Sequence, residues 1–294
     1  MKRIYLFLSA FFIVLSSCDN ELDVNSDWEE VTVIFGLLDA GLGKELQQVR
    51  INKAFLGQMS ALDMAQYTDS INFTDSLDVK IYRIKNGIVK DSIVLVDSIV
   101  LREGGLFSDT TVVYSFINND FLKSNSNYEL VVKNTSSGNR VSAYTNIISD
   151  FSWGVQFKPF YNIGFYKNDL SDFDDKQINW NNVNNGKIYQ LNVEFNYSEE
   201  DINTGLKSYH SIDWLHPMET YTSGEMSTKL EGEQFFNFLQ RNIVKDNTIE
   251  RTFESIYVEM TVGTEELETY INVNKPITGI VQQRPQYSNI INGI

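Results

Sequence analysis

The chain of 294 residues contains one cysteine, two histidines and four prolines. A single cysteine excludes an internal disulfide framework and a cysteine-rich zinc site, and two histidines leave little material for a histidine-based metal centre. The sequence also contains neither a Gly-x-Ser-x-Gly elbow nor a His-Glu-x-x-His pair, which mark two large classes of hydrolase. We therefore expect no catalytic residues, no cofactor and no metal site.

Basic residues are also scarce. The chain has 24 lysines and arginines against 39 acidic side chains, which gives a net charge of −15. A protein that binds nucleic acid needs a basic surface to neutralise phosphates, so we expect no nucleic-acid partner. The hydrophobic content of 42% excludes a disordered chain, and no set of long apolar runs suggests a multi-span membrane protein. The length suits one large domain or two of about 130 residues.

The first 17 residues have the features of a signal peptide. A basic start is followed by an apolar run from Ile4 to Leu15, which is too short to cross a bilayer as a helix. Residues 15–18 read Leu-Ser-Ser-Cys and resemble the bacterial lipobox, in which the cysteine is acylated after cleavage. We predict a signal peptide over residues 1–17 and lipid attachment at Cys18, against an ordinary signal peptide with an incidental cysteine.

Such an anchor makes the membrane a partner through the N-terminal lipid, since several acyl chains hold a protein essentially permanently. Cleavage removes two of the 24 basic residues, so 22 basic and 39 acidic side chains leave the mature chain at −17. Residues 18–30 are acidic and are predicted to form a tether. Acidic residues after the cysteine are similar to the surface-export signal of Bacteroidota lipoproteins. We expect the outer membrane and the cell surface, with a periplasm-facing anchor as the alternative.

The residues after the tether favour β-structure, and we divide them near position 149. Alternating and β-branched runs predict about seven strands over residues 31–148, which indicates an immunoglobulin-like β-sandwich domain, with a long loop and a helical turn at 54–67. The Asn86-Gly87 pair predicts a tight hairpin. Residues 149–294 are predicted to form an α+β domain with two short helices. The helices are expected at 231–243 and 264–273, and strands at 188–197, 209–215 and 253–262. The fold class is therefore mainly β.

Several ordered motifs resemble a family of uncharacterised Bacteroidota outer-membrane lipoproteins, a domain of unknown function with an N-terminal β-sandwich. An early strand ends at Gly36, a facing strand holds residues 49–51, and an Asn-Tyr-Glu-Leu sequence occurs at 127–130. The tail at 287–294 is similar to the Asn-Ile-x-x-Gly ending of the family, which usually continues through a further Gly and Phe. The resemblance implies a lipoprotein that accompanies a TonB-dependent receptor. It implies no activity and no catalytic residues.

Other clusters have a structural and a functional interpretation. His210 and His216 are expected to be packing or surface residues rather than catalytic ones. The acidic stretch at 169–175 is expected to be a plain loop rather than a Ca²⁺ site, because it lacks the glycine and terminal glutamate of an EF-hand. The aromatic residues clustered between Trp153 and Tyr166 are expected in a core, with a sugar-stacking or protein-binding surface as the alternative.

A recurring tripeptide of aspartate, a hydroxyl residue and an apolar residue or threonine is similar to the O-glycosylation signal of exported Bacteroidota proteins. The structural alternative is a turn residue before a strand. The hydroxyl residues of the five copies are Ser70, Ser76, Ser92, Ser98 and Thr110.

Together these features predict a lipid-anchored surface lipoprotein that binds or assists rather than catalyses, in association with a TonB-dependent outer-membrane receptor. The alternative is an adhesion or envelope-structural lipoprotein without a small-molecule ligand, and an enzyme is the least favoured class. The sequence does not identify the ligand.

Overall fold

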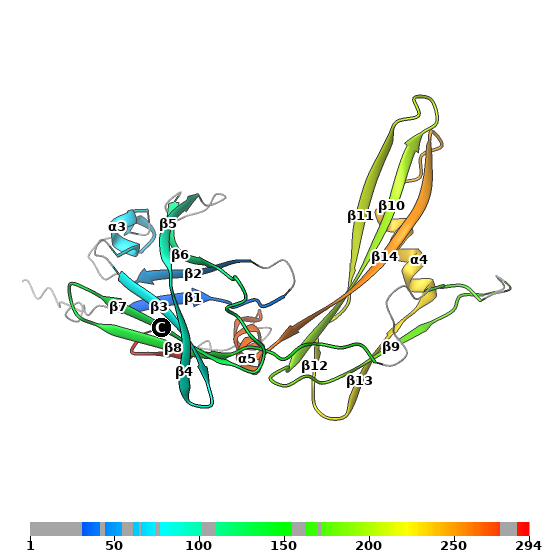
Figure 1. The fold of residues 1–294 in the computed structure, drawn as a ribbon. Coiled ribbons are helices and arrows are strands. Elements are labelled where there is room, and N and C mark those ends of the chain that lie inside the picture. Colours follow the sequence, from blue (N-terminus) through cyan, green and yellow to red (C-terminus); the bar gives the residue numbers. More distant parts are fainter. Residues whose placement is uncertain are drawn as a thin grey trace, which may run out of the picture.

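The computed structural model describes residues 31–41, 45–54, 61–64, 66–73, 77–101, 110–154, 163–167, 169, 172–276 and 287–293. Within these residues the chain is mainly antiparallel β-sheet with four short helices. Two lobes meet at a junction and diverge from it (Figure 1). The prediction of a mainly β chain is confirmed, whereas the immunoglobulin-like form of the first half stays a prediction.

The first lobe, residues 31–148 with the tail at 287–293, contains two sheets. One sheet has the strand order β1 (Thr32–Gly36), β2 (Leu46–Lys53), β6 (Thr110–Ile117), β5 (Val96–Leu101). The other has the order β15 (Ile290–Ile291), β8 (Arg140–Asn146), β7 (Asn127–Asn134), β3 (Leu77–Lys85), β4 (Ile88–Val94). The helical turn α2 (Ala61–Met64) lies within 54–67, where the sequence predicts a loop with a helical turn, and a second turn, α3 (Thr68–Ile71), follows directly after that segment.

Local sequence explains how the two sheets are connected. Asn86 and Gly87 adopt φ values of 55° and 72°, which are the left-handed conformations that a tight hairpin between β3 and β4 requires. The chain then passes from one sheet to the other at Leu95, which is buried and whose amide donates to the carbonyl of Val79 at 2.9 Å. Residues of both sheets form one hydrophobic core, and its most buried members are Ile51, Val79, Ile81, Tyr128 and Val132.

The second lobe, residues 149–263, also contains two sheets. In the larger, β10 (Ile188–Asp201) is central, with β14 (Ile249–Gly263) on one side and β11 (Lys207–Leu215) and β12 (Glu219–Thr220) on the other. The smaller pairs β9 (Lys176–Asn181) with β13 (Glu225–Leu230). Helix α4 (Gly232–Asn242) lies between β13 and β14 in the sequence, and α5 (Glu265–Asn274) follows β14.

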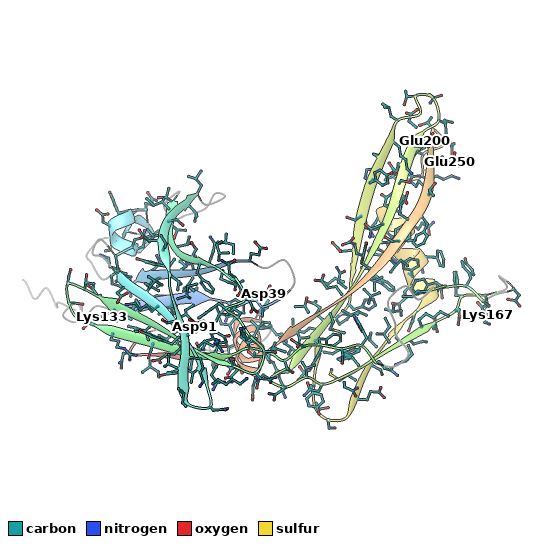
Figure 2. All side chains as sticks on the ribbon, viewed as in Figure 1. Asp39, Asp91, Lys133, Lys167, Glu200 and Glu250 are labelled. Carbon is teal, nitrogen blue, oxygen red and sulfur yellow. The ribbon has the colours of Figure 1, made fainter. Side chains whose placement is uncertain are left out.

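Inward-facing residues of both sheets form the core of this lobe. Val193 is fully buried at the centre of β10, and Trp180 and Ile178 on β9 are each 1% exposed. Beyond this core, β10, β11 and β14 continue as a three-stranded arm, with Glu200 and Glu250 at its far end (Figure 2). The tip carries exposed apolar side chains, since Ile202, Leu206 and Val244 are 60%, 73% and 80% exposed.

Asparagines connect the two lobes. The Asn184 side chain donates to Asn125 at 3.1 Å, and the Asn185 side chain donates to the carbonyl of Ile147 at 3.1 Å. Asn125 and Asn185 both have positive φ, a conformation that asparagine tolerates better than most residues. The asparagine-rich stretch around residue 180 therefore contributes contacts between lobes in addition to turns.

The tail returns to the first lobe, where β15 pairs with β8 through Ile290 and Ile291. A Cβ atom on Gly293 would lie 2.7 Å from the carbonyl oxygen of Thr32, so the close approach of the tail to β1 requires glycine. The division of the chain near residue 149 stays a prediction, and the tail adds a strand to the first lobe.

Candidate functional site

Helix α4 is fixed at its N-terminus by a neighbouring loop. Its N-cap residue, Glu231, makes no side-chain cap, and instead the amide of Gly232 donates to the Asp175 carboxylate at 3.0 Å. Lys229 forms an ion pair with the same carboxylate at 2.8 Å, and these two contacts lower the pKa of Asp175. A Cβ atom at position 232 would lie 2.6 Å from the carbonyl oxygen of Phe165, so only glycine fits.

Aromatic side chains attach the inner face of α4 to the sheet. Phe235 is buried, stacks on Phe165 with a centroid separation of 4.2 Å, and contacts Phe195 and Trp214 at 5.8 and 5.7 Å. Phe236 continues the cluster toward Tyr166 at 4.7 Å. Buried aromatic pairs of this kind add to stability beyond their buried area, so α4 has a defined position over β10 and β11.

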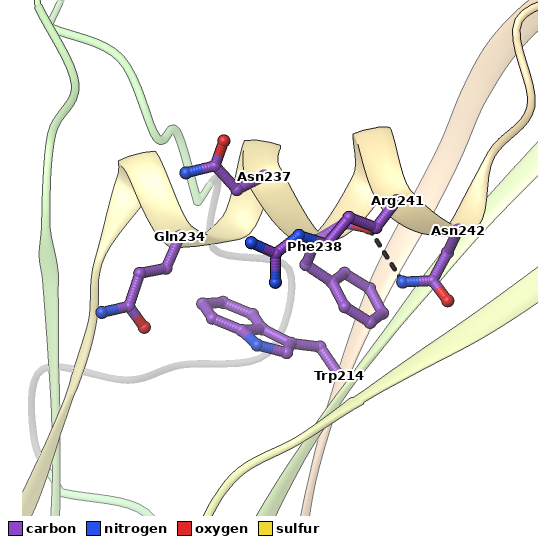
Figure 3. Close-up of a pocket in the computed structure, with 6 residues that line it drawn as sticks. All are labelled: Trp214, Gln234, Asn237, Phe238, Arg241 and Asn242. Carbon is purple, nitrogen blue, oxygen red and sulfur yellow. Dashed lines mark hydrogen bonds between the residues drawn. The ribbon is translucent and has the colours of Figure 1, made fainter.

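A pocket of about 390 Å³ lies beside this cluster, between an adjacent face of α4 and Trp214 of β11 (Figure 3). Its helical members recur at a spacing of three or four residues, so they occupy one stripe of the helix. The lining residues are Trp214, Gln234, Asn237, Phe238, Arg241 and Asn242. Trp214 and Phe238 are nearly parallel at 6.0 Å, with an interplanar angle of 23°.

Several polar groups of this pocket have no partner in the described part of the chain. The side chains of Asn237 and Arg241 make no hydrogen bond or ion pair with described residues. The Gln234 amide nitrogen donates to Glu231 at 2.5 Å and that of Asn242 donates to the carbonyl of Phe238 at 2.8 Å. The amide oxygens of both remain available to accept. The pocket therefore offers donors, acceptors and one cation beside two aromatic rings.

A second, more open hollow of about 530 Å³ runs along β14. It is lined by Phe151, Trp153, Glu194, Tyr257, Val258, Glu259 and Met260. Its charged members are carboxylates, whereas the charged member of the α4 pocket is an arginine. The two hollows therefore favour ligands of opposite charge.

The two histidines lie on and just after β11. The ring of His210 stacks on Tyr197 at 5.4 Å, and its Nε2 atom lies 2.8 Å from the Ser208 hydroxyl and 3.6 Å from Glu199. Serine and carboxylate thus approach the same ring nitrogen, whereas a triad needs them on opposite nitrogens. His216 lies 4.4 Å from Trp214, and burial lowers its pKa.

The acidic residues near 169–175 are engaged by lysines. Asp172 pairs with Lys167 at 3.1 Å and Asp174 pairs with Lys176, in addition to the Asp175 contacts above. The ion pair with Lys167 lowers the pKa of Asp172. Within the described ranges no group of three or more acidic, histidine or cysteine side chains is placed to hold a metal ion.

The predicted aromatic cluster lies only partly within the described residues. Phe165 is buried in the core of the second lobe, Trp153 packs against that core, and Tyr166 is 39% exposed. Phe157, Phe160 and Tyr161 lie outside the described residues.

The predicted modification sites are similarly divided. Cys18 and Ser76 lie outside the described residues. Ser92 on β4 and Ser98 on β5 are exposed, whereas Ser70 in α3 and Thr110 at the start of β6 are half-buried. In the part of the chain that is described, no helix has the length and apolarity needed to cross a bilayer.

Comparisons with known proteins do not identify the chain. No protein-family model matches it, and no curated protein has a significantly similar sequence.

The sequence alone does not predict the α4 pocket. Apolar residues at helical spacing in 231–243 predict an amphipathic helix, and its polar stripe is typical of a solvated face. Trp214 belongs to a strand that ends 17 residues before α4 begins. The only sequence signal is that the stripe contains two asparagines, a glutamine and an arginine, and that no acidic residue lies three or four positions before or after Arg241.

Proposed function

We propose that this protein is a lipid-anchored lipoprotein of the outer-membrane surface that binds a ligand without catalysing a reaction and assists a TonB-dependent receptor. The observation that supports the binding role best is the α4 pocket, where free polar groups of Asn237 and Arg241 lie beside the rings of Trp214 and Phe238. Pockets that bind small molecules combine apolar walls with a few placed polar groups.

Two features support binding rather than catalysis. The pocket contains no nucleophile, carboxylate or histidine among its six lining residues. Elsewhere in the described residues, Ser208, His210 and Glu199 meet at a single ring nitrogen, so the set does not have triad geometry.

The sequence supports the anchor and the scaffold. A short basic start, an apolar run of about twelve residues and a lipobox-like sequence ending at Cys18 are together typical of a lipoprotein signal. We propose that the two sheets of the first lobe are an immunoglobulin-like sandwich that serves as scaffold, so that loops and the second lobe meet ligand and partner.

The arm supports a protein partner. Exposed apolar side chains gathered at the end of a projecting element are typical of interaction surfaces, and Ile202, Leu206 and Val244 have this arrangement. The same observation favours the second candidate, an adhesion or envelope-structural lipoprotein, in which the arm contacts another envelope protein and the pocket has no ligand.

The decisive experiment isolates the tagged, lipidated protein from native outer membranes. Recovery of a TonB-dependent receptor supports the accessory role, and its loss from a triple variant with Ile202, Leu206 and Val244 changed to serine would assign the contact to the arm. Repeated recovery of no receptor contradicts the accessory role. Recovery of an envelope protein of another class would favour the adhesion candidate.

The anchor is tested separately in cells. Labelled palmitate is expected in the wild type and not in Cys18→Ser, and protease added to intact cells is expected to digest the wild type. Protection from the protease, with labelling intact, would place the protein on the periplasmic side instead.

A further inference from the structure

Arg241 is an uncompensated cation in a strongly acidic protein. The chain carries 39 acidic side chains, yet none lies within ion-pair distance of this guanidinium among the described residues. Other basic side chains of the second lobe, such as Lys207, Lys229 and Arg251, do pair with carboxylates. A guanidinium prefers planar, bidentate partners, so Arg241 is available to bind an anionic group from a ligand.

The direction of this side chain places the anion over the middle of α4. Figure 3 shows the guanidinium drawn back along the helix toward the indole of Trp214, away from the helix C-terminus. This matters because the last carbonyl groups of a helix carry partial negative charge and repel anions. An anion bound to Arg241 therefore lies close to the ring of Trp214 and away from the unfavourable end.

The remaining groups are suited to a hydroxylated ligand. The amide oxygens of Gln234 and Asn242 can accept from hydroxyl groups, and the amide of Asn237 can both donate to and accept from them. Trp214 and Phe238 offer apolar rings against which the C–H face of a sugar can pack. A ligand with one anionic group, several hydroxyl groups and an apolar face uses all of these features.

Other anions use fewer of them. A polyphosphate would meet one cation on a protein with a net charge of −15, so long-range repulsion opposes it. An aromatic acid would pair with Arg241 and stack on Trp214, but it would form no contact with the three exposed amides.

We propose that the α4 pocket binds an acidic sugar, a pyranose ring that carries a carboxylate or a sulfate group. The anion pairs with Arg241, the ring packs on Trp214, and hydroxyl groups bond to Gln234, Asn237 and Asn242. This inference rests on the proposed binding function and names its ligand class. Carboxylate and sulfate share the chemistry that Arg241 recognises, and the probes below distinguish them.

The test uses the purified lipidated protein in a non-ionic detergent and measures binding by calorimetry and by tryptophan fluorescence. The probes are trigalacturonic acid, its fully methylated ester, a sulfated galactose disaccharide and the same disaccharide without sulfate. Each pair differs in the anionic group alone. We expect at least one acidic probe to bind about tenfold or more tightly than its neutral counterpart, the amount that one charge-assisted contact provides.

Variants assign the preference to individual residues. Arg241→Gln is expected to weaken the acidic probe about tenfold and to change the neutral one less than twofold, and Arg241→Lys is expected to be intermediate because it keeps the charge and loses the fork. Trp214→Phe is expected to weaken both members of a pair equally. The matched controls are Lys245→Gln, which removes an exposed cation near the arm tip, and Tyr209→Ala, which removes an exposed ring of β11; both are expected to bind like the wild type.

The outcomes separate this inference from the proposed function. Equal affinity for acidic and neutral probes, or an Arg241→Gln effect no larger than that of Lys245→Gln, overturns the acidic-sugar inference and leaves a binding role intact. Absence of binding to all four probes also overturns it, while recovery of a TonB-dependent receptor with the same preparation would still support the accessory role. Failure of both experiments rejects both proposals.

Discussion

The two lobes each contain a buried tyrosine whose hydroxyl closes the preceding loop. In the first lobe the Tyr128 hydroxyl accepts from the amide of Lys123 at 2.7 Å and donates to the carbonyl of Phe121 at 3.0 Å. In the second lobe the Tyr189 hydroxyl accepts from the amide of Val183 at 3.0 Å and donates to Asn182 at 2.5 Å. Both side chains are 1% exposed, and burial raises the pKa of each, so both hydroxyls stay protonated at neutral pH.

Replacing either tyrosine by phenylalanine keeps the ring and leaves a backbone donor and an acceptor without partners. Orphaning buried polar groups costs about 1–3 kcal/mol, and we take about 2 kcal/mol. The entropy of unfolding is about 2.1 cal/mol/K per residue, so a loss of about 2 kcal/mol lowers the melting temperature of a lobe of roughly 120 residues by about 8 °C. Tyr128→Phe and Tyr189→Phe should therefore each lower one transition by about this amount.

Tryptophan placement makes the assay specific to one lobe. The described tryptophans are Trp153, Trp180 and Trp214, all in the second lobe, and Trp28 lies in the predicted tether and is changed to phenylalanine in every sample. Tryptophan fluorescence then follows the second lobe alone, while circular dichroism follows both. Tyr189→Phe is expected to shift the fluorescence transition, and Tyr128→Phe is expected to shift only a circular dichroism transition.

One result would refute this reasoning. If Tyr128→Phe lowers the fluorescence transition as much as Tyr189→Phe does, the two lobes unfold as one cooperative unit and the asparagine contacts at the junction couple them. The predicted division near residue 149 would then fail as a statement about folding, although the two cores would remain separate in space.

Three further predictions concern the second lobe and the modification sites. Gly232→Ala is expected to destabilise the second lobe by about 1–3 kcal/mol, because the new methyl group meets the backbone at Phe165 and Asp174, whereas Gly164→Ala, with no atom nearer than 4.0 Å, should be neutral in the same urea titration. Because the pKa of His216 is lowered in the folded state, the unfolded chain binds a proton more readily than the folded chain does once the pH falls toward the usual value near 6.5. The contribution of neutral His216 to the free energy of unfolding is therefore fully present above that pH and declines as pH falls from 7.5 to 5.5. Fluorescence-monitored unfolding should show this decline, and a His216→Gln variant with an unchanged slope would contradict it. If the Asp-Ser sites carry sugars, intact mass of the native protein should exceed polypeptide plus lipid, with exposed Ser92 and Ser98 modified in preference to half-buried Ser70, and a mass equal to polypeptide plus lipid would exclude glycosylation.

Elements with strong local signals could be predicted from the sequence. The alternation in 77–84 gives β3, the Asn86-Gly87 pair gives its hairpin, and the capping threonine at 264 begins α5, where its hydroxyl accepts from the amide of Leu267. Each of these depends on residues that are close in the chain. The predicted strand at 253–262 lies within the longer β14, because pairing with β10 extends it at both ends beyond its local pattern.

Strands whose partners are distant in the sequence could not be predicted in the same way. The β9 and β13 pair joins residues 176–181 to 225–230. Ile178 and Trp180 alternate with polar residues over only six positions, so the pair depends on tertiary burial of Ile178, Trp180 and Leu230. The tail behaves similarly, because β15 has two residues and forms only where β8 presents a free edge.

The α4 pocket likewise depends on a partner that is distant in the sequence. Helices α4 and α5 are both amphipathic and both have a polar stripe, so the sequence alone gives them equal standing. The stripe of α5 is acidic, and its Glu268 is bonded to Thr220 at 2.7 Å, whereas the stripe of α4 holds amides and an arginine and faces Trp214. What distinguishes a binding surface from a solvated one is therefore the strand that tertiary folding places opposite the helix. Trp214→Ala, which removes the aromatic ring opposite the helix, is therefore expected to abolish binding of the acidic probe to the α4 pocket in calorimetry, even though every polar residue of the helix is retained.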